Sequence, residues 1–131
     1  MGEMKLLLDT HIFLWWISGD RRLSASAREI LRDPRNERFL SSISVAEIAL
    51  KTALGKLKLR DTAENTVRSG MSRLPALELP LRISHTLLLA SLPLHHRDPF
   101  DRLLIAQAMS EGIPIMTRDP QMQLYGVTTI H

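Results

Sequence analysis

MKLLLDT, residues 4–10, is the stretch of sequence that decides the fold. Residues 4–8 are apolar apart from Lys5, and the run is too short to indicate a helix before it ends at an Asp-Thr pair. A short apolar run without polar alternation is typical of a strand covered on both faces, as in the middle of a parallel sheet. Asp9 then follows the carboxyl end of this strand, where functional groups gather in open α/β sheets. Asp is also a favoured N-cap, so capping of the next helix stays a second interpretation of Asp9.

The composition limits the class of protein. The chain has 131 residues, 44% of them hydrophobic, which predicts one globular domain spanning residues 1–131. It has no cysteine, which excludes a disulfide framework and thiolate chemistry. The longest apolar stretches, 12–17 and 87–92, are far shorter than the roughly 20 residues of a membrane helix, and no signal peptide is recognisable. We therefore expect a soluble, cytoplasmic protein that does not contact a membrane.

Basic residues gather in two early segments, and the formal net charge is +3. The first group is Arg21, Arg22, Arg28, Arg32, Arg35 and Arg38, and the second is Lys51, Lys56, Lys58 and Arg60. Such clusters permit contact with a nucleic acid. A solvated helical face explains them equally well.

Predicted helices and strands alternate along the chain. Caps, glycines and prolines place helices at 11–18, 24–33, 44–54, 62–73, 87–92 and 98–112. Strands are expected at 39–41, 76–79, 113–117 and 127–130, with 76–79 at an edge because prolines flank it. The pattern predicts an α/β fold, a three-layer α/β/α sandwich with a central, mainly parallel sheet.

Three local interpretations accompany this assignment. Ser44 is followed three residues later by Glu47, which indicates a capping box at the start of a helix. The segment 87–92 is expected to be a short buried helix with Ser84 as its cap. Trp15 and Trp16 cannot both enter one small core from a single helix, so we expect one of them in a secondary interface.

Acidic residues stand at the boundaries of the predicted elements. They are Asp9, Glu47, Asp98, Asp101 and Asp119. Each has a local explanation as a helix cap, a partner for a helix dipole or a turn residue. These local explanations do not account for what the acids share, which is a position at the end of a strand or the start of a helix. In a parallel sheet, the strand ends and the helix starts that follow them lie on one edge. We therefore expect these carboxylates to converge.

A convergence of carboxylates implies a particular chemistry. Several of them cannot stay ionised in one small site unless a cation neutralises them or protons are retained. Hard carboxylate oxygens without cysteine select Mg²⁺ or Mn²⁺ over zinc. Such ions activate water and clamp the oxygens of a phosphodiester during hydrolysis. The basic clusters would then form a rim that holds a phosphate backbone.

Four segments resemble the PIN-domain proteins, and most closely the VapC-type toxins of bacterial and archaeal toxin–antitoxin pairs. They are LLLDTH at 6–11, SVAEI at 44–48, RDPFDRLLIAQA at 97–108 and TRD at 117–119, in the family's order and spacing. The resemblance implies a metal-dependent endoribonuclease, usually dimeric, that a small antitoxin encoded beside it holds inactive. It also implies that RNA is the substrate.

The resemblance assigns roles to residues one by one. The family's four acids, which are both catalytic residues and metal ligands, match Asp9, Glu47, Asp101 and Asp119. Thr10 and Thr117 match the hydroxyl positions that accompany the first and fourth acids.

Two positions depart from the family's common pattern, and the roles of His95 and His96 are not decided by the sequence. His11 stands where many members carry Asn, and Asp98 is an additional acid that we expect to cap the helix and support Asp101. His95 and His96 next to Asp98 are either an acid–base pair or loop residues that contact RNA, and a metal-activated water requires no histidine.

The sequence leaves competing functions. The leading one is a toxin ribonuclease, and the alternatives are a PIN-like binding module without turnover and a nuclease that processes RNA or cleaves DNA. An apolar groove near Trp15, Trp16 and residues 43–54 is expected to receive an antitoxin helix. A basic side chain of the antitoxin would then be attracted to the acidic pocket.

Overall fold

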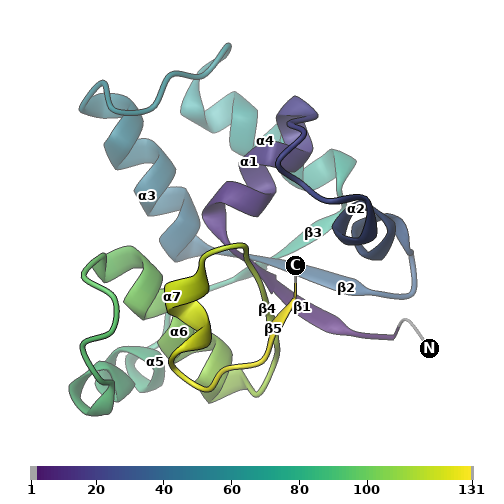
Figure 1. The fold of residues 1–131 in the computed structure, drawn as a ribbon. Coiled ribbons are helices and arrows are strands. Elements are labelled where there is room, and N and C mark those ends of the chain that lie inside the picture. The colour runs from purple at the N-terminus through teal and green to yellow at the C-terminus, as the bar shows by residue number, and fades with distance from the viewer. Residues whose placement is uncertain (1–2, 131) are drawn as a thin grey trace.

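The computed structural model describes residues 3–130, which form a five-stranded sheet with helices on both faces (Figure 1). The strands are β1 (Lys5–Leu8), β2 (Glu37–Ser41), β3 (Ala76–Leu79), β4 (Ile115–Met116) and β5 (Thr129–Ile130). Their order in the sheet is β3-β2-β1-β4-β5, and every neighbouring pair is parallel. The predicted parallel α/β fold is confirmed, with β3 at an edge.

The helices divide between the two faces of the sheet. They are α1 (Thr10–Ser18), α2 (Ala25–Arg32), α3 (Ser42–Ala53), α4 (Ala63–Arg73), α5 (Ile83–Leu87), α6 (Pro99–Glu111) and α7 (Pro120–Gln123), with a 3₁₀ helix, η1, at Leu88–Ser91. Helices α1, α2 and α4 pack on one face, and α6, α7 and η1 pack on the other (Figure 1). This is the three-layer α/β/α sandwich that the sequence predicts. Within residues 3–130 no helix has the length and apolar character needed to cross a bilayer.

The central strand β1 explains why the leucine run decides the fold. Leu6, Leu7 and Leu8 are all fully buried. Leu6 and Leu8 belong to the core under α1, α2 and α4, whereas Leu7 belongs to the core under α6. Because successive side chains of a strand point to opposite faces, only a strand with helices on both sides buries all three.

Two local expectations were wrong in detail. Helix α3 begins at Ser42, because the hydroxyl of Ser41, at the end of β2, accepts a hydrogen bond from the Ile43 N–H at 3.0 Å. Ser44 and Glu47 therefore lie inside the helix and form no capping box. The segment 87–92 is no buried helix: α5 ends at Leu87, which is 70% exposed, and η1 follows it.

The two tryptophans of α1 are both half-buried against the first core. The guanidinium group of Arg22 lies 4.9 Å from the ring centroid of Trp15, and that of Arg32 lies 6.0 Å from the ring of Trp16. Each ring thus packs on the core on one side and carries an arginine near its outer side. Burial of one tryptophan in a secondary interface stays a prediction.

Helix α4 packs closely on α1 at Gly70, which is buried. A Cβ atom at this position would lie 2.5 Å from Cδ1 of Ile17 and 2.6 Å from Cζ of Phe13. Both distances are well below van der Waals contact. Glycine in a helix costs about 1 kcal/mol relative to alanine, so the close approach of the two helices offsets an intrinsic disadvantage.

We expect Gly70→Ala to lower the free energy of unfolding by about 1–3 kcal/mol, although alanine is the better helix former, because the added methyl group forces Phe13 and Ile17 to move. Urea unfolding followed by circular dichroism measures the change. Ser69→Ala, at the neighbouring exposed position, is the matched control and should change the stability by about 0.5 kcal/mol or less. A Gly70→Ala protein as stable as the wild type would contradict this account of the packing.

Candidate functional site

The carboxyl ends of β1 and β4 lie side by side in the middle of the sheet. Strand β1 leads to α1, and β4 leads to α7, so two loops leave the same edge. The strand order turns back at this point, because β2 and β3 lie on one side of β1 while β4 and β5 lie on the other. Ligands of open α/β sheets commonly bind at such a place.

Asp9 both caps α1 and lies at this edge. Its Oδ1 accepts a hydrogen bond from the His11 N–H at 3.4 Å, and its Oδ2 accepts one from Oγ1 of Thr117 at 2.6 Å. The side chain is buried, and burial raises the pKa of the Asp9 carboxyl, with the Thr117 hydrogen bond opposing the rise. The capping interpretation and the site interpretation of Asp9 are therefore compatible.

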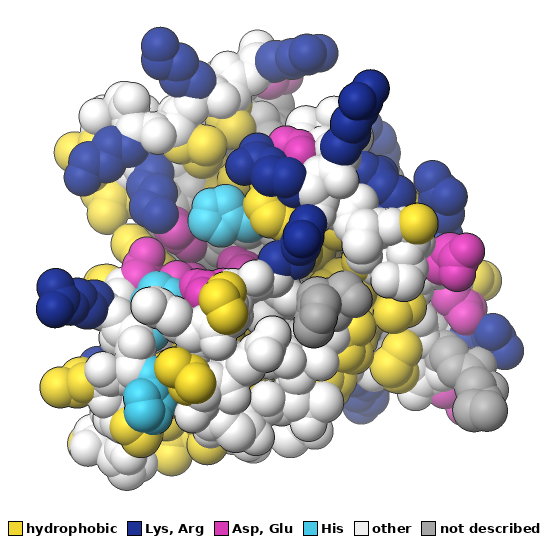
Figure 2. Space-filling view, viewed as in Figure 1, with side chains coloured by type: hydrophobic (Ala, Val, Ile, Leu, Met, Phe, Trp, Pro, Cys, Tyr) yellow, Lys and Arg dark blue, Asp and Glu magenta, His cyan; other side chains and the backbone are white. Residues whose placement is uncertain are grey.

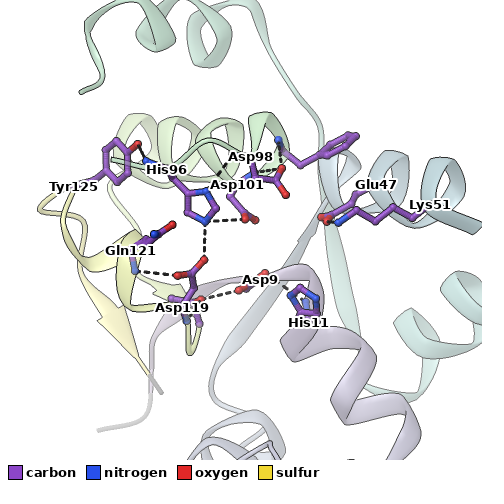
Figure 3. Close-up of polar contacts among 12 residues, drawn as sticks. Asp9, His11, Glu47, Lys51, His96, Asp98, Asp101, Asp119, Gln121 and Tyr125 are labelled. Carbon is purple, nitrogen blue, oxygen red and sulfur yellow. Dashed lines mark hydrogen bonds and ion pairs between the residues drawn. The ribbon is translucent and has the colours of Figure 1, made fainter. Parts of the chain in front are cut away.

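Glu47 reaches the same edge from the second turn of α3. It is buried, and its Oε2 forms an ion pair with Nζ of Lys51, one turn further along the helix. Its Oε1 is buried and has no hydrogen-bond partner among the described residues. Figure 3 shows the carboxylate pointing toward Asp9 and Asp101. A buried carboxylate oxygen without a partner is costly, so this atom indicates a ligand that binds there.

Asp98 and Asp101 come from the start of α6. Oδ1 of Asp98 accepts hydrogen bonds from the Phe100 N–H at 2.8 Å and the Asp101 N–H at 3.4 Å, so Asp98 is the N-cap that the sequence predicts. Burial, followed by the charges of Asp9, Asp98 and Glu47, raises the pKa of Asp101 from 3.8 to about 7. The carboxyl groups of Asp9, Asp98 and Glu47 are therefore close enough to Asp101 to oppose its ionisation.

Asp119 completes the group from the loop after β4. Its Oδ1 accepts a hydrogen bond from the Gln121 N–H at 2.9 Å and so caps α7. Its Oδ2 lies 2.7 Å from Nε2 of His96, and the same nitrogen lies 3.1 Å from Oδ2 of Asp101 (Figure 3). Ligand atoms of His96, Asp101 and Asp119 all lie within 4.8 Å of one another. The sequence left the role of His96 open, and nothing in it places this ring between two acids.

Hydroxyl groups connect the elements beneath the carboxylates. Thr117 donates to Asp9 and accepts from the Asp119 N–H at 3.0 Å. Thr10 donates to Oγ of Ser44 at 2.8 Å and thereby joins α1 to α3. Ser44 was predicted from the sequence to be a helix cap, so this bridging contact was missed. The available signal in the sequence was a small polar residue, Ser44, one helical turn before Glu47.

Two members of the basic clusters have roles inside the fold. Arg38 is buried and donates to the carbonyl oxygens of Leu31, Asp33 and Pro75, so it is no part of a rim. Lys51 belongs to the acidic pocket itself.

A groove of about 580 Å³ between α1, the α3–α4 loop and α4 begins beside the pocket at His11. Its lining includes Trp15 and four basic side chains: Arg22, Lys58, Arg60 and Arg73. Figure 2 shows acidic side chains in a hollow of the surface with lysine and arginine side chains around it.

The donor set fits a divalent cation. The four carboxylates offer oxygen ligands, the chain has no thiol, and Glu47 supplies an unpartnered buried oxygen. Mg²⁺ and Mn²⁺ prefer such ligands. Burial is the main cause of the raised pKa of Asp101, and a cation would offset the second cause, the repulsion from the neighbouring carboxylates.

Comparison with known families agrees with this arrangement. The family model described as PIN domain matches residues 6–127, which is most of the chain. The chain belongs to the PIN-domain family. The family resemblance predicted from the sequence is confirmed, and it covers all four acids.

Solved structures similar to this PIN domain span nearly its whole length. One is VapBC2 from Rickettsia felis, bound to a DNA fragment from the VapBC2 promoter. It is 18% identical with a TM-score of 0.73, and the match covers 97% of this chain and 98% of that one. FitAcB from Neisseria gonorrhoeae is 20% identical with a TM-score of 0.67 and 96% coverage of both chains. VapBC-1 from nontypeable Haemophilus influenzae is 16% identical with a TM-score of 0.66 and 97% coverage of both. At these identities the likeness shows the fold. No curated protein sequence matches the chain.

The raised pKa of Asp101 predicts a pH-dependent stability in the PIN domain without metal. In the folded state the Asp101 carboxyl keeps its proton up to a pH of about 7, whereas the ordinary pKa of an aspartate is 3.8. The folded state therefore loses stability as the pH rises from 3.8 to about 7. The side-chain amide of an Asp101→Asn variant cannot ionise. In EDTA, we expect Asp101→Asn to be more stable than the wild type by about 1–3 kcal/mol near pH 8, and this advantage should disappear near pH 4.

Urea unfolding at a series of pH values measures this difference. Glu78→Gln, which removes an exposed acid on β3, is the matched control and should follow the wild-type curve. Parallel curves for the wild type and Asp101→Asn would show that Asp101 titrates normally in the folded protein.

Proposed function

We propose that this PIN domain, taken as one unit over residues 1–131, is a metal-dependent endoribonuclease and the toxin of a type II toxin–antitoxin pair. The observation that carries the proposal is the convergence of carboxyl groups at one edge of the sheet: Asp9 and Glu47 lie near enough to Asp101 to contribute to its raised pKa, and His96 joins Asp101 to Asp119. The cofactor is Mg²⁺ or Mn²⁺, because the donor atoms are hard carboxylate oxygens. The reaction is hydrolysis of RNA phosphodiesters.

The four carboxylates hold the cation, and neighbouring side chains fix them. A divalent ion supplies Lewis-acid activation of a water and neutralises charge on the phosphate. Thr117 and the His11 N–H fix the two oxygens of Asp9, and Lys51 fixes one oxygen of Glu47 and leaves the other free.

Asp98 and Thr10 act as supporting residues. Asp98 holds the first turn of α6 in place beneath Asp101 by accepting from two backbone N–H groups. Thr10, through its bond to Ser44, fixes the start of α1 relative to α3. Their side chains position the helices that carry the ligands.

RNA approaches along the basic groove. Arg22, Lys58, Arg60 and Arg73 line it, and His11 lies where the groove meets the acidic pocket. Basic side chains bind the phosphate backbone without reading sequence, so the groove sets the path of the strand rather than the cleavage site. The choice of RNA over DNA rests on the resemblance to VapC-type toxins.

The same groove suits an antitoxin segment. Leu14, Trp15, Leu57 and Leu59 give it an apolar floor that an amphipathic helix can cover. The related VapBC and FitAcB structures contain two named components, which supports a protein partner for this chain. A basic side chain of the antitoxin that entered the acidic pocket would replace the cation. The pair would act in the cytoplasm.

A homodimer is the proposed assembly, and exposed apolar residues support it. Four large apolar side chains that follow β3 are 39–83% exposed: Leu81, Ile83, Leu87 and Leu94. A soluble chain seldom leaves several such groups close together in sequence exposed to water without a partner.

We expect Asp9→Asn and Asp101→Asn to reduce RNA cleavage at least about 100-fold, because each removes a charged ligand of the proposed ion. Cleavage of total RNA with Mg²⁺, with Mn²⁺ and with EDTA measures the loss, and expression in bacteria tests growth arrest. Circular dichroism should show an unchanged fold. Glu78→Gln, remote from the pocket, should cleave like the wild type.

Undiminished cleavage by both variants would contradict the assigned site. Binding of cations and RNA by a wild type that cleaves neither RNA nor DNA would favour the PIN-like binding module. Cleavage without growth arrest would favour a processing nuclease over a toxin.

We expect the wild type to co-purify with the small protein encoded beside it, and Trp15→Glu to weaken that complex at least about 10-fold, because a charge in the apolar floor opposes docking. Calorimetry with the purified pair measures the affinity. Lys5→Glu, an exposed change on β1 outside the groove, is the control. Failure to form any complex would remove the toxin–antitoxin assignment while leaving the ribonuclease intact.

A further inference from the structure

His96 is held between two of the site carboxylates by contacts on its backbone N–H and on both ring nitrogens. Its side chain is only 11% exposed. Its backbone N–H donates to Oη of Tyr125 at 2.8 Å, and its Nδ1 accepts from the Asp98 N–H at 3.1 Å. Its Nε2 faces Oδ2 of Asp119 at 2.7 Å and Oδ2 of Asp101 at 3.1 Å (Figure 3).

These contacts determine which nitrogen of His96 carries the proton. A backbone N–H can only donate, so the nitrogen that accepts from Asp98, Nδ1, has no proton. The proton of the ring is therefore on Nε2, which points at the two carboxylates. Both partners there are acceptors when ionised, so the arrangement is complementary.

The same reasoning excludes the simplest metal-binding role for this ring. The spacing of His96, Asp101 and Asp119 alone would suit a three-ligand metal site. However, a nitrogen that carries a proton has no lone pair for a metal ion. To ligate through Nε2, the ring would have to move its proton to Nδ1 and place it against the Asp98 N–H, at the start of α6.

We infer that His96 is a positioning residue: its Nε2–H lies against Oδ2 of Asp101 and Oδ2 of Asp119, holds the two carboxylates together and leaves Oδ1 of Asp101 for the divalent cation. The inference rests on the proposed function. The two acids come from different elements, α6 and the loop after β4, and they repel each other when both are ionised. An uncharged donor between them draws them together without cancelling the negative charge that attracts the cation.

The backbone around His96 is also built to hold the ring in place. Tyr125, next to the C-terminal end of α7, fixes the His96 N–H, and its ring packs edge-on against His95 at 5.1 Å between centroids. Asp98 fixes the imidazole from the start of α6. The segment before α6 thereby connects α6 and α7. Asp101 lies in the first turn of α6, and Asp119 is the N-cap of α7.

Metal affinity and NMR of the full chain test this role. The variants are His96→Ala, which removes the donor, and His96→Gln, whose amide nitrogen restores a donor near the position of Nε2. His95→Ala is the matched control, because the ring of His95 packs on Tyr125 rather than between two acids. Calorimetry compares Mg²⁺, which prefers oxygen ligands, with Ni²⁺, which binds imidazole well.

We expect His96→Ala to lower the binding affinity for both cations by a similar factor of about 10 to 100, as is typical when a residue that orients metal ligands is removed. His96→Gln should recover most of the affinity, and His95→Ala should retain it. Imidazole ¹⁵N spectra of the wild type should show the proton on Nε2 both without metal and with Mg²⁺.

Each of the following results would overturn the inference. A loss confined to Ni²⁺, or a proton that moves to Nδ1 when Mg²⁺ binds, would make His96 a ligand. Unchanged affinity in a folded His96→Ala protein would make it incidental. If that variant does not fold, a His96→Gln protein that folds but stays as weak as a donor-free site decides against it. A wild type that binds neither cation would overturn the proposed function as well, which distinguishes the two failures.

Discussion

Repulsion between carboxylates at one edge of a parallel sheet is the constraint on which the site depends. The polarity of the sheet brings the loops after β1 and β4 to the same edge, and α3 and α6 extend their acids over it. Burial then makes ionisation costly, and it raises the pKa of both Asp9 and Asp101. Part of this cost is offset locally, because Asp9, Asp98 and Asp119 each accept hydrogen bonds from the first N–H groups of a helix. Helix capping and site formation are thus two effects of the same residues.

The negative charge of the pocket is offset unevenly, and this unevenness indicates where a cation would lie. Lys51 offsets the charge of Glu47 on one side, and His96 approaches Asp119 and Asp101 on the other. Between these two positions lie Oε1 of Glu47, which has no hydrogen-bond partner within residues 3–130, and Asp101, whose pKa rises to about 7. A cation placed between them would satisfy an oxygen and relieve a repulsion at once. The internal contacts therefore leave space for one more positive charge and indicate where it belongs.

The parts predictable from the sequence were those that follow from periodicity and sheet polarity. Leu6 to Leu8 required a strand buried on both faces, and the polarity of the sheet then brought the acids to one edge. The start of α3 was misplaced because Ser41 and Ser44 are both good caps, and the sequence does not reveal where β2 ends. The apolar run 87–92 did not reveal that Leu87 is exposed. The position of His96 could not be predicted, because it depends on the conformation of a loop. That loop is fixed by Tyr125, which is distant in sequence, and by the backbone N–H of Asp98 at the start of α6.

The stability of the fold and the activity of the site make opposite demands on the same edge. The core supplies stability through β1 and through the close contact of α1 and α4 at Gly70, whereas the acids oppose it until a positive charge arrives. Any ligand that binds the folded state alone stabilises it by mass action, and a cation and a basic side chain of a partner satisfy the same carboxylates. The two must then compete for one pocket. Under the proposed function, an antitoxin that inserted such a side chain would stabilise this protein and inhibit it through a single interaction, because the charges that would attract a cation would also attract that side chain.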